Sequence, residues 1–259
     1  MTFIDSHTHL FSDQFKDDIE SVIERAVANH VRGFVLPNIN TSTVPKMLEL
    51  TNRFPKLMYP AIGLHPCDVK EGFENDLVTL EQYLLKDPKP FCAIGEIGMD
   101  LYWDKLTLGI QRKAFEIQVG WAKKYKKPII IHARDSFNEL FNSLDALNDK
   151  HLTGVFHCFT GTLDQAKKII DYSGFKLGIG GVLTFKNAGI DKVVEQIGLE
   201  HLILETDSPY LAPVPHRGGR NESSYLLMIA KKLAEVHKKK LSEISSITTR
   251  NARELFSLS

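Results

Sequence analysis

The segment KPIIIH, residues 127–132, places three isoleucines between a lysine–proline pair and a histidine. HLILET, residues 201–206, has the same form, a short apolar run that ends in polar side chains. A strand that is apolar at nearly every position is typical of a parallel sheet with both faces covered. The two segments therefore predict parallel strands that are buried on both sides and that end in polar residues.

Similar short apolar segments alternate with longer amphipathic ones along all 259 residues. The apolar segments predict strands at 2–6, 33–37, 57–62, 91–96, 128–132, 153–157, 175–180 and 201–205. The amphipathic segments predict helices at 13–29, 42–53, 77–86, 108–125, 135–147, 162–172, 188–197 and 221–237, followed by two short helices at 241–247 and 250–256. Repeated strand–helix units in a chain of this length favour an α/β fold of the (β/α)8 TIM-like barrel type over the alternative, an open doubly wound sheet. No linker-like stretch divides the chain, so residues 1–259 are expected to form a single barrel domain.

The composition, 43% hydrophobic and 25% charged, is that of an ordinary globular protein. The 32 basic and 32 acidic side chains balance, so nucleic acid would have to be bound by a local patch of charge. Cys67, Cys92 and Cys158 include no C-x-x-C pair, which indicates a reducing compartment and excludes a disulfide framework. The beginning of the sequence does not resemble a signal peptide and no apolar run reaches membrane-spanning length, so a cytoplasmic protein without a membrane partner is expected. No obligate protein partner is evident.

The polar residues at the ends of the predicted strands are the candidates for chemistry, because active sites of such barrels lie at the carboxyl ends of the strands. In FIDSHTHLF, residues 3–11, His7 and His9 are two positions apart and so share one face of an extended chain. The later strands end in His65, Glu96, His132, His157, and Glu205 with Asp207.

Five of the ten histidines thus lie at predicted strand ends. Taken singly, a histidine or carboxylate there is more often a hydrogen-bonded structural residue, and Asp207 in TDSP is also suited to a turn. Taken together, four imidazoles and two carboxylates at one barrel mouth require a cation, because buried polar and charged groups need partners. The set His7, His9, Glu96, His132, His157 and Asp207 therefore predicts a metal site.

A plausible division gives one ion His7, His9 and Asp207 and the other ion His132 and His157, with Glu96 between them. Two-metal hydrolases hold their ions about 3.5–4 Å apart and activate a water molecule between them. Mixed imidazole and carboxylate ligands suit Zn²⁺ or Mn²⁺, whereas Mg²⁺ usually takes more oxygen ligands. The cofactors are thus two divalent ions, with Mg²⁺, Mn²⁺ and Zn²⁺ all left open.

At the same residues the chain resembles a known family, the TatD-type metal-dependent deoxyribonucleases of the amidohydrolase superfamily. The motifs that carry the resemblance, in order along the chain, are FIDSHTHL, GEIGMD, PIIIHARD, FHCFTG and ILETDSPYLAP. The resemblance implies a TIM-like barrel, a divalent-metal site and hydrolysis of phosphodiester bonds in DNA, often as an exonuclease. It also matches His7, His9, Glu96, His132, His157 and Asp207 to the metal ligands of the family, with Glu96 as the bridging carboxylate.

The chain departs from the family pattern at two places. The family usually has a second histidine after the proline of the third strand end, and Cys67 stands there in GLHPCD. PHRGGRNESSYL lacks the proline that often follows the Asn-Glu pair. The first departure puts a role of this loop in substrate binding in doubt, although His65 itself is kept as a candidate substrate contact. Neither departure touches a candidate ligand.

The predicted mechanism is attack of the activated water on phosphorus, with charge on the phosphoryl oxygens neutralised by the ions. The catalytic candidates are Glu96, Asp207, which is placed to take the proton of the water, and Glu205. Glu205 either assists, or holds an additional ion, or orients a neighbouring side chain. The chain contains neither a G-x-S-x-G elbow nor a Walker-type loop, so no competing apparatus is predicted.

Positive and aromatic residues near the same rim are candidates for substrate binding. Arg134 follows His132, and His216, Arg217 and Arg220 lie in PHRGGR, where barrels often bind phosphate; the alternative for that loop is a solvated surface. Tyr102 and Trp103 are placed either to stack on an unpaired base or to pack their own loop.

Two other functional classes stay open. The same metal site would also serve a lactonase, a cyclic amidase or a deacylase of aminoacyl-tRNA. A barrel that binds nucleic acid without catalysis is the second alternative, and the intact set of candidate ligands argues against it. The favoured substrate is DNA, with RNA also open.

Overall fold

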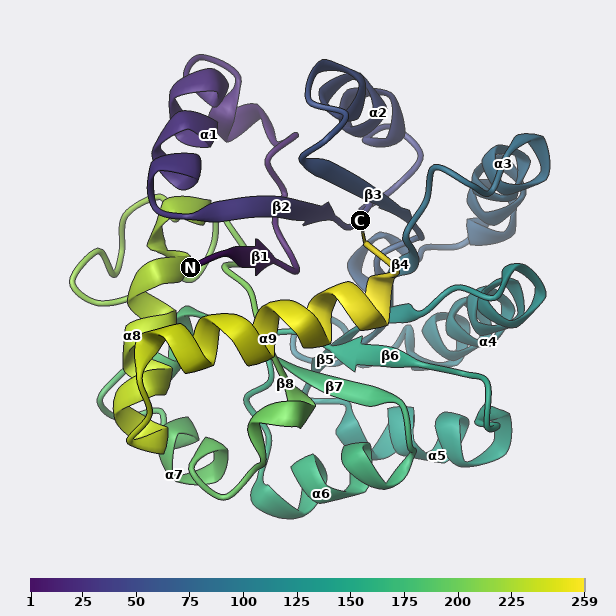
Figure 1. Ribbon diagram of the computed structural model, residues 1–259. Coiled ribbons are helices and arrows are strands. Elements are labelled where there is room, and N and C mark those ends of the chain that lie inside the picture. The colour runs from purple at the N-terminus through teal and green to yellow at the C-terminus, as the bar shows by residue number, and fades with distance from the viewer. Residues whose placement is uncertain (259) are drawn as a thin grey trace.

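The computed structural model describes residues 1–258, and within them eight parallel strands are hydrogen-bonded in the order β1 to β8. The strands are β1 (Phe3–Asp5), β2 (Val31–Leu36), β3 (Met58–Ile62), β4 (Ala93–Asp100), β5 (Ile129–Arg134), β6 (Gly154–Phe156), β7 (Phe175–Ile179) and β8 (Leu202–Leu204). The helices are α1 (Ile19–Ala28), α2 (Val44–Arg53), α3 (Phe73–Lys86), α4 (Leu108–Tyr125), α5 (Phe137–Leu147), α6 (Leu163–Asp171), α7 (Ile190–Val194), α8 (Leu226–His237) and α9 (Leu241–Phe256). Short 3₁₀ helices lie at η1 (Asp13–Phe15), η2 (Pro66–Asp68), η3 (Gly181–Thr184), η4 (Leu199–His201) and η5 (Ser223–Tyr225). This arrangement is the predicted TIM-like barrel (Figure 1). None of the helices in residues 1–258 has the length and apolar composition needed to cross a membrane.

The sheet closes between its first and last strands. A parallel bridge joins Thr8 to Ser208, just beyond the ends of β1 and β8. The buried carboxylate of Asp5 accepts hydrogen bonds from the backbone N–H of Thr206 at 2.9 Å and from its hydroxyl at 2.7 Å. Burial raises the pKa of Asp5 to about 7, against the lowering effect of these hydrogen bonds. The closure brings residues from the two ends of the chain to one seam of the barrel.

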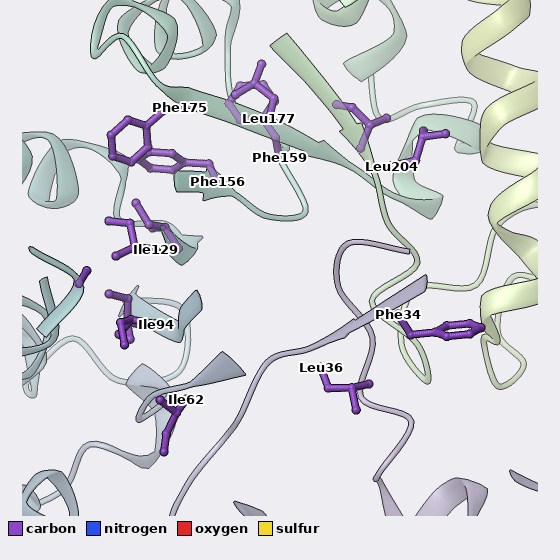
Figure 2. Packing of buried hydrophobic residues seen from close by; sticks show 14 of the residues in the cluster. Phe34, Leu36, Ile62, Ile94, Ile129, Phe156, Phe159, Phe175, Leu177 and Leu204 are labelled. Atoms are coloured by element: carbon purple, nitrogen blue, oxygen red, sulfur yellow. The ribbon is translucent and has the colours of Figure 1, made fainter. Parts of the chain in front are cut away.

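The three isoleucines of KPIIIH face two different layers. Ile129 and Ile131 of β5 pack in the layer between strands and helices, whereas Ile130 packs inside the barrel. Figure 2 shows the outer layer, in which Ile62, Ile94, Ile129 and Phe156 come from successive strands. A strand with apolar partners on both faces explains why alternation of polar and apolar residues is absent from these segments.

The interior of the barrel is filled by side chains from β1 to β6, from β8 and from α9. These are Ile4, Val35, Ala61, Cys92, Ala93, Ile130, Val155 and Ile203, with Ala252 and Phe256 of α9. Figure 1 shows α9 lying across the barrel, and its Thr249 and Asn251 bond to carbonyls where β1 and β8 begin. The amino-terminal end of the barrel is thereby covered, and the polar strand ends gather at the opposite end.

The prediction of two short helices at 241–247 and 250–256 is wrong, because α9 is continuous. The polar stretch between them is buried and satisfied without breaking the helix. Thr248 donates to the carbonyl of Ile244 one turn earlier, at 2.9 Å, and Asn251 donates to the carbonyls of Leu199 and Leu202, both at 2.8 Å. Thr248 is thus satisfied within the helix, and Asn251 anchors the helix to the barrel instead of ending it.

Other predicted helices are shorter in the structure. The helix predicted at 188–197 spans Ile190–Val194 and begins after Gly189, which has a left-handed φ of 70°. The one predicted at 221–237 begins at Leu226, because Asn221 is held in the preceding loop by bonds to the carbonyls of Thr206 and Tyr210. The one predicted at 13–29 divides into η1 and α1.

We expect Asn251→Ala to lower the free energy of unfolding by about 1–3 kcal/mol, because two buried carbonyls would lose their partner. Urea denaturation followed by circular dichroism measures this change. Arg250→Ala on the exposed side of α9 is the matched control and should change stability by less than about 0.5 kcal/mol. Equal effects of the two substitutions would show that the contact does not anchor α9.

Candidate metal centre

Glu96 of β4 lies at the centre of the polar cluster at the carboxyl ends of the strands. Its Oε2 is 3.2 Å from Nε2 of His7 and 3.5 Å from Nε2 of His9. Its Oε1 is 2.9 Å from Nδ1 of His132 and 2.8 Å from Nε2 of His157. The carboxylate is 2% exposed, and each of its oxygens faces a different pair of imidazoles. Strand pairing is irregular between Ile94 and Ile97, where this carboxylate enters the barrel.

Asp207 completes the first pair. Its Oδ1 lies 3.6 Å from Nε2 of both His7 and His9. Asp207 has a left-handed φ of 56°, and its N–H donates to the carbonyl of His7 at 2.9 Å across the seam of the barrel. The structure thus brings together all six residues predicted as ligands, and His7, His9 and Asp207 form one group that could hold an ion. Their roles as ligands stay a prediction.

The electrostatics of the cluster fit divalent cations. Burial lowers the pKa of His7 well below its usual value and that of His9 to about 4, so both rings are neutral and present lone pairs. Burial alone would raise the pKa of Glu96, but the imidazoles around it hold the pKa well below the usual range. Burial raises the pKa of Asp207 to about 8, with Glu96 and Glu205 contributing. The carboxylates Glu96, Asp100 and Glu205 raise the pKa of His132 and His157 against the effect of burial, so the cluster attracts positive charge at these two rings. An anionic carboxylate together with imidazole nitrogens is a donor set that suits Zn²⁺ or Mn²⁺.

Asp100, the last residue of β4, also belongs to the cluster, although the sequence patterns do not mark it as a candidate site residue. Its Oδ2 is 2.8 Å from Nε2 of His132, and its Oδ1 accepts from the N–H groups of Tyr102 and Trp103 at 3.0 and 3.2 Å. Burial would raise the pKa of Asp100, but the hydrogen bond with His132 and the loop amides hold it at about 2. With a metal ion bound, a proton held on Nε2 by Asp100 would leave the lone pair of Nδ1 for the ion. The spacing in GEIGMD could have identified it, because Asp100 and Glu96 are an even number of positions apart and so point to the same face of the strand.

We expect Asp100→Ala to weaken metal binding by about 10–100-fold, as is usual for a carboxylate that orients a ligating histidine. Calorimetric titration of the metal-free protein with Zn²⁺ or Mn²⁺ measures the affinity. Asp104→Ala is the control, since Asp104 caps a turn in the same loop through the N–H of Leu106. An unchanged affinity of Asp100→Ala would contradict the orienting role.

Glu205 lies directly after β8, behind His157. Its Oε1 accepts from the N–H of Cys158 at 2.6 Å and is 3.5 Å from Nδ1 of His157. A Cβ at Gly178 would lie 2.2 Å from Oε2 of Glu205, so the glycine makes room for this carboxylate. His7, His157 and Glu205 also form a group that could hold an ion. For Glu205, both the role of orienting His157 and the role of holding an additional ion therefore stay open.

His65 follows β3 and lies beside the second pair of imidazoles. Its Nε2 is 3.3 Å from Oε1 of Glu96, and its ring meets that of His132 edge to face, with 4.6 Å between the centroids. The side chain is 15% exposed, whereas that of Glu96 is 2% exposed. His65 thus belongs to the same cluster but is open to the mouth of the barrel.

Arg134, Tyr102 and Trp103 form a cationic and aromatic group at the rim. The guanidinium of Arg134 lies 3.8 Å from the ring centroid of Tyr102 and 5.5 Å from that of Trp103. The two aromatic residues are 55% and 70% exposed. Beside Arg134 is a cleft of about 500 Å³ between the loops that follow β5 and β6, lined also by Asn138 and Thr160. Tyr102 and Trp103 also meet each other edge to face, with 5.0 Å between their ring centroids, and their contact with a base stays a prediction.

The loop after β8 carries the remaining substrate-binding candidates. His216 stacks on Tyr225 with 4.2 Å between the ring centroids, and Arg217 lies 4.4 Å from the ring centroid of Phe185. Both groups are thereby held in place on the loop, and their contacts with substrate stay a prediction.

Arg220 is held by partners far away in the sequence. It donates to both carboxylate oxygens of Asp18, at 2.8 and 2.6 Å, and to the carbonyl of Gln14 at 2.7 Å. These contacts tie the loop after β8 to the segment before α1. Any contact of Arg220 with substrate would have to compete with this ion pair.

Comparison with known proteins gives consistent results. The family model described as TatD related DNase matches residues 4–257. The uncharacterized metal-dependent hydrolase YabD of Bacillus subtilis is 39% identical over 253 residues, which cover 97% of this chain and 98% of YabD. The crystal structure of YjjV, a TatD homolog from Escherichia coli K12, has a TM-score of 0.93 at 29% identity and covers 99% of this chain and 98% of its own. A TatD family hydrolase of Entamoeba histolytica has a TM-score of 0.88 at 24% identity, covers 100% of this chain and 99% of its own, and supports the fold.

Proposed function

Because the chain belongs to the TatD-related DNase family of metal-dependent hydrolases, we propose that it hydrolyses phosphodiester bonds in DNA with two divalent metal ions. The observation that carries this proposal is the position of Glu96, whose two oxygens face two separate groups of imidazoles within 3.5 Å. A single carboxylate shared in this way is suited to a pair of ions.

His7, His9 and Asp207 would hold one ion, and His132 and His157 the other, with Glu96 shared between them. When bound, the two ions would supply the positive charge that activates water and stabilises the phosphoryl oxygens. The high share of imidazole ligands supports Zn²⁺ or Mn²⁺ more than Mg²⁺.

The side chains around the ions have distinct tasks in this reaction. Asp207 accepts the proton of the attacking water, since its side chain is 13% exposed and thus more accessible than that of Glu96. Asp100 and Glu205 hold His132 and His157 from behind. Arg134 contacts a phosphate of the substrate, and Tyr102 and Trp103 provide an exposed surface on which a base stacks.

The experiment is to incubate the metal-loaded protein with DNA labelled at one end, with and without EDTA, and to separate the products on a sequencing gel. We expect metal-dependent cleavage, and a ladder of products shortened stepwise from one end would indicate an exonuclease. RNA of the same sequence tests the choice of sugar. Intact DNA together with cleavage of a lactone or of aminoacyl-tRNA by the same preparation would refute the proposal.

A further inference from the structure

Three ligand atoms near β3, β4 and β5 lie close enough together to hold a metal ion. They belong to His65, Glu96 and His132 and are all within 4.8 Å of one another. Distance alone would make His65 a further metal ligand. The hydrogen bonds of its ring point to a different role.

The Nδ1 atom of His65 is already occupied. It accepts a hydrogen bond from the backbone N–H of Cys67 at 3.1 Å, where His65 caps the short helix η2. The backbone of His65 is itself held, because its N–H donates to the carbonyl of Ile39 at 2.8 Å. A neutral imidazole that accepts at Nδ1 carries its proton on Nε2. The nitrogen that faces Glu96 is therefore an N–H donor without a lone pair for a metal.

His132 has the opposite arrangement. A carboxylate lies at each of its ring nitrogens, Asp100 at 2.8 Å from Nε2 and Glu96 at 2.9 Å from Nδ1. With a metal ion bound, Asp100 would keep the proton on Nε2 and Nδ1 would offer its lone pair to the ion. Nδ1 of His132 and Nε2 of His65 approach the same oxygen of Glu96, at 2.9 and 3.3 Å, but only Nδ1 of His132 has no backbone-determined proton and is free to serve as a ligand. Nε2 of His65 lies 3.3 Å from Oε1 of Glu96, but within residues 1–258 no group accepts a hydrogen bond from it, so a ligand at the mouth of the barrel can do so.

We infer that His65 is not a metal ligand but donates a hydrogen bond from Nε2 to a non-bridging oxygen of the phosphate that is cleaved. The inference rests on the proposed function, since it assigns a catalytic residue to that reaction. His65 is 15% exposed at the mouth of the barrel, next to the carboxylate that both ions would share. Negative charge grows on the phosphoryl oxygens during the reaction, and a fixed donor there stabilises the transition state.

The proton of His65 stays on Nε2 throughout this step. If the ring gave this proton to the leaving oxygen, it would become an imidazolate, which a neutral histidine does not readily form. Neutral imidazoles act as hydrogen-bond donors to developing oxyanions in other enzymes. His65 is accordingly a donor and not a general acid.

The test compares His65→Ala, His65→Gln and His132→Ala with the wild-type protein. Elemental analysis should find the wild-type number of metal ions in both His65 variants and fewer in His132→Ala. With DNA, His65→Ala should lower kcat by about 10²–10³-fold with little change of KM, and His65→Gln should recover part of the loss because its amide N–H replaces the donor. Circular dichroism establishes that the variants are folded.

A second substrate separates donation from acid catalysis. Thymidine 5′-(p-nitrophenyl phosphate) has a leaving group that needs no proton, so His65→Ala should lose the same factor with it as with DNA. A loss that disappears with this substrate, a missing metal ion in His65→Ala, or an unchanged kcat would each overturn the inference while the proposed function stands. Wild-type protein that binds metal but cleaves neither substrate would overturn the proposed function and this inference with it.

Discussion

Glu96→Ala is expected to reduce metal-dependent hydrolysis by at least about 10³-fold, which corresponds to about 4 kcal/mol of transition-state stabilisation. The reason is that both candidate metal positions share this side chain. Oε2 faces His7 and His9, and Oε1 faces His132 and His157, with all four distances between 2.8 and 3.5 Å. Steady-state cleavage of labelled DNA measures the loss.

Two controls make the result interpretable. Glu96→Gln keeps the shape of the side chain but lacks its charge, so it should also lose activity and bind fewer metal ions per chain by elemental analysis. Glu74→Ala on the exposed surface of α3 should retain both. A Glu96→Ala protein that keeps its full complement of metal and more than a tenth of its activity would show that Glu96 does not bridge the ions.

The barrel could be predicted from the sequence because most of its strands are short and largely apolar runs. In β5, for example, Ile129 and Ile131 face the helices while Ile130 faces the interior, and this double burial is visible as unbroken hydrophobicity. The path of α9 could not be predicted in this way. Its buried polar residue Asn251 is satisfied by carbonyls 49 and 52 positions away, and such partners leave no local signal.

In the candidate site, too, the residues that could be predicted are marked by their position in the local sequence, whereas the others depend on contacts with distant parts of the chain. His7, His9 and Glu96 could be singled out because side chains at strand ends share one rim of a barrel, whatever the rest of the chain does. The pairing of Arg220 with Asp18, 202 positions earlier, has no such marker in the sequence. The role of Asp100 depends on its contact with His132, and the donor at Nε2 of His65 depends on a backbone N–H. Neither contact has a marker in the sequence, so both are recognised only in the three-dimensional structure.

Asp207→Asn is expected to lower kcat by about 10²–10⁴-fold, the range for loss of a positioned proton acceptor. The substitution preserves shape, and asparagine tolerates the left-handed φ of 56° at this position, so the fold should be unchanged. The amide oxygen still faces Nε2 of His7 and His9, where the carboxylate oxygen now lies at 3.6 Å from both. The amide cannot accept the proton of the attacking water.

Measurement of kcat together with metal content distinguishes this effect from loss of an ion. If Asp207→Asn retains its metal and loses at least about 10²-fold in kcat, the carboxylate acts on the proton. If it loses one ion, Asp207 serves mainly to hold the metal beside His7 and His9. A variant with full metal content and less than a tenfold loss would leave Glu205, the buried carboxylate directly after β8, as the candidate proton acceptor, and Glu205→Gln would then be the decisive substitution.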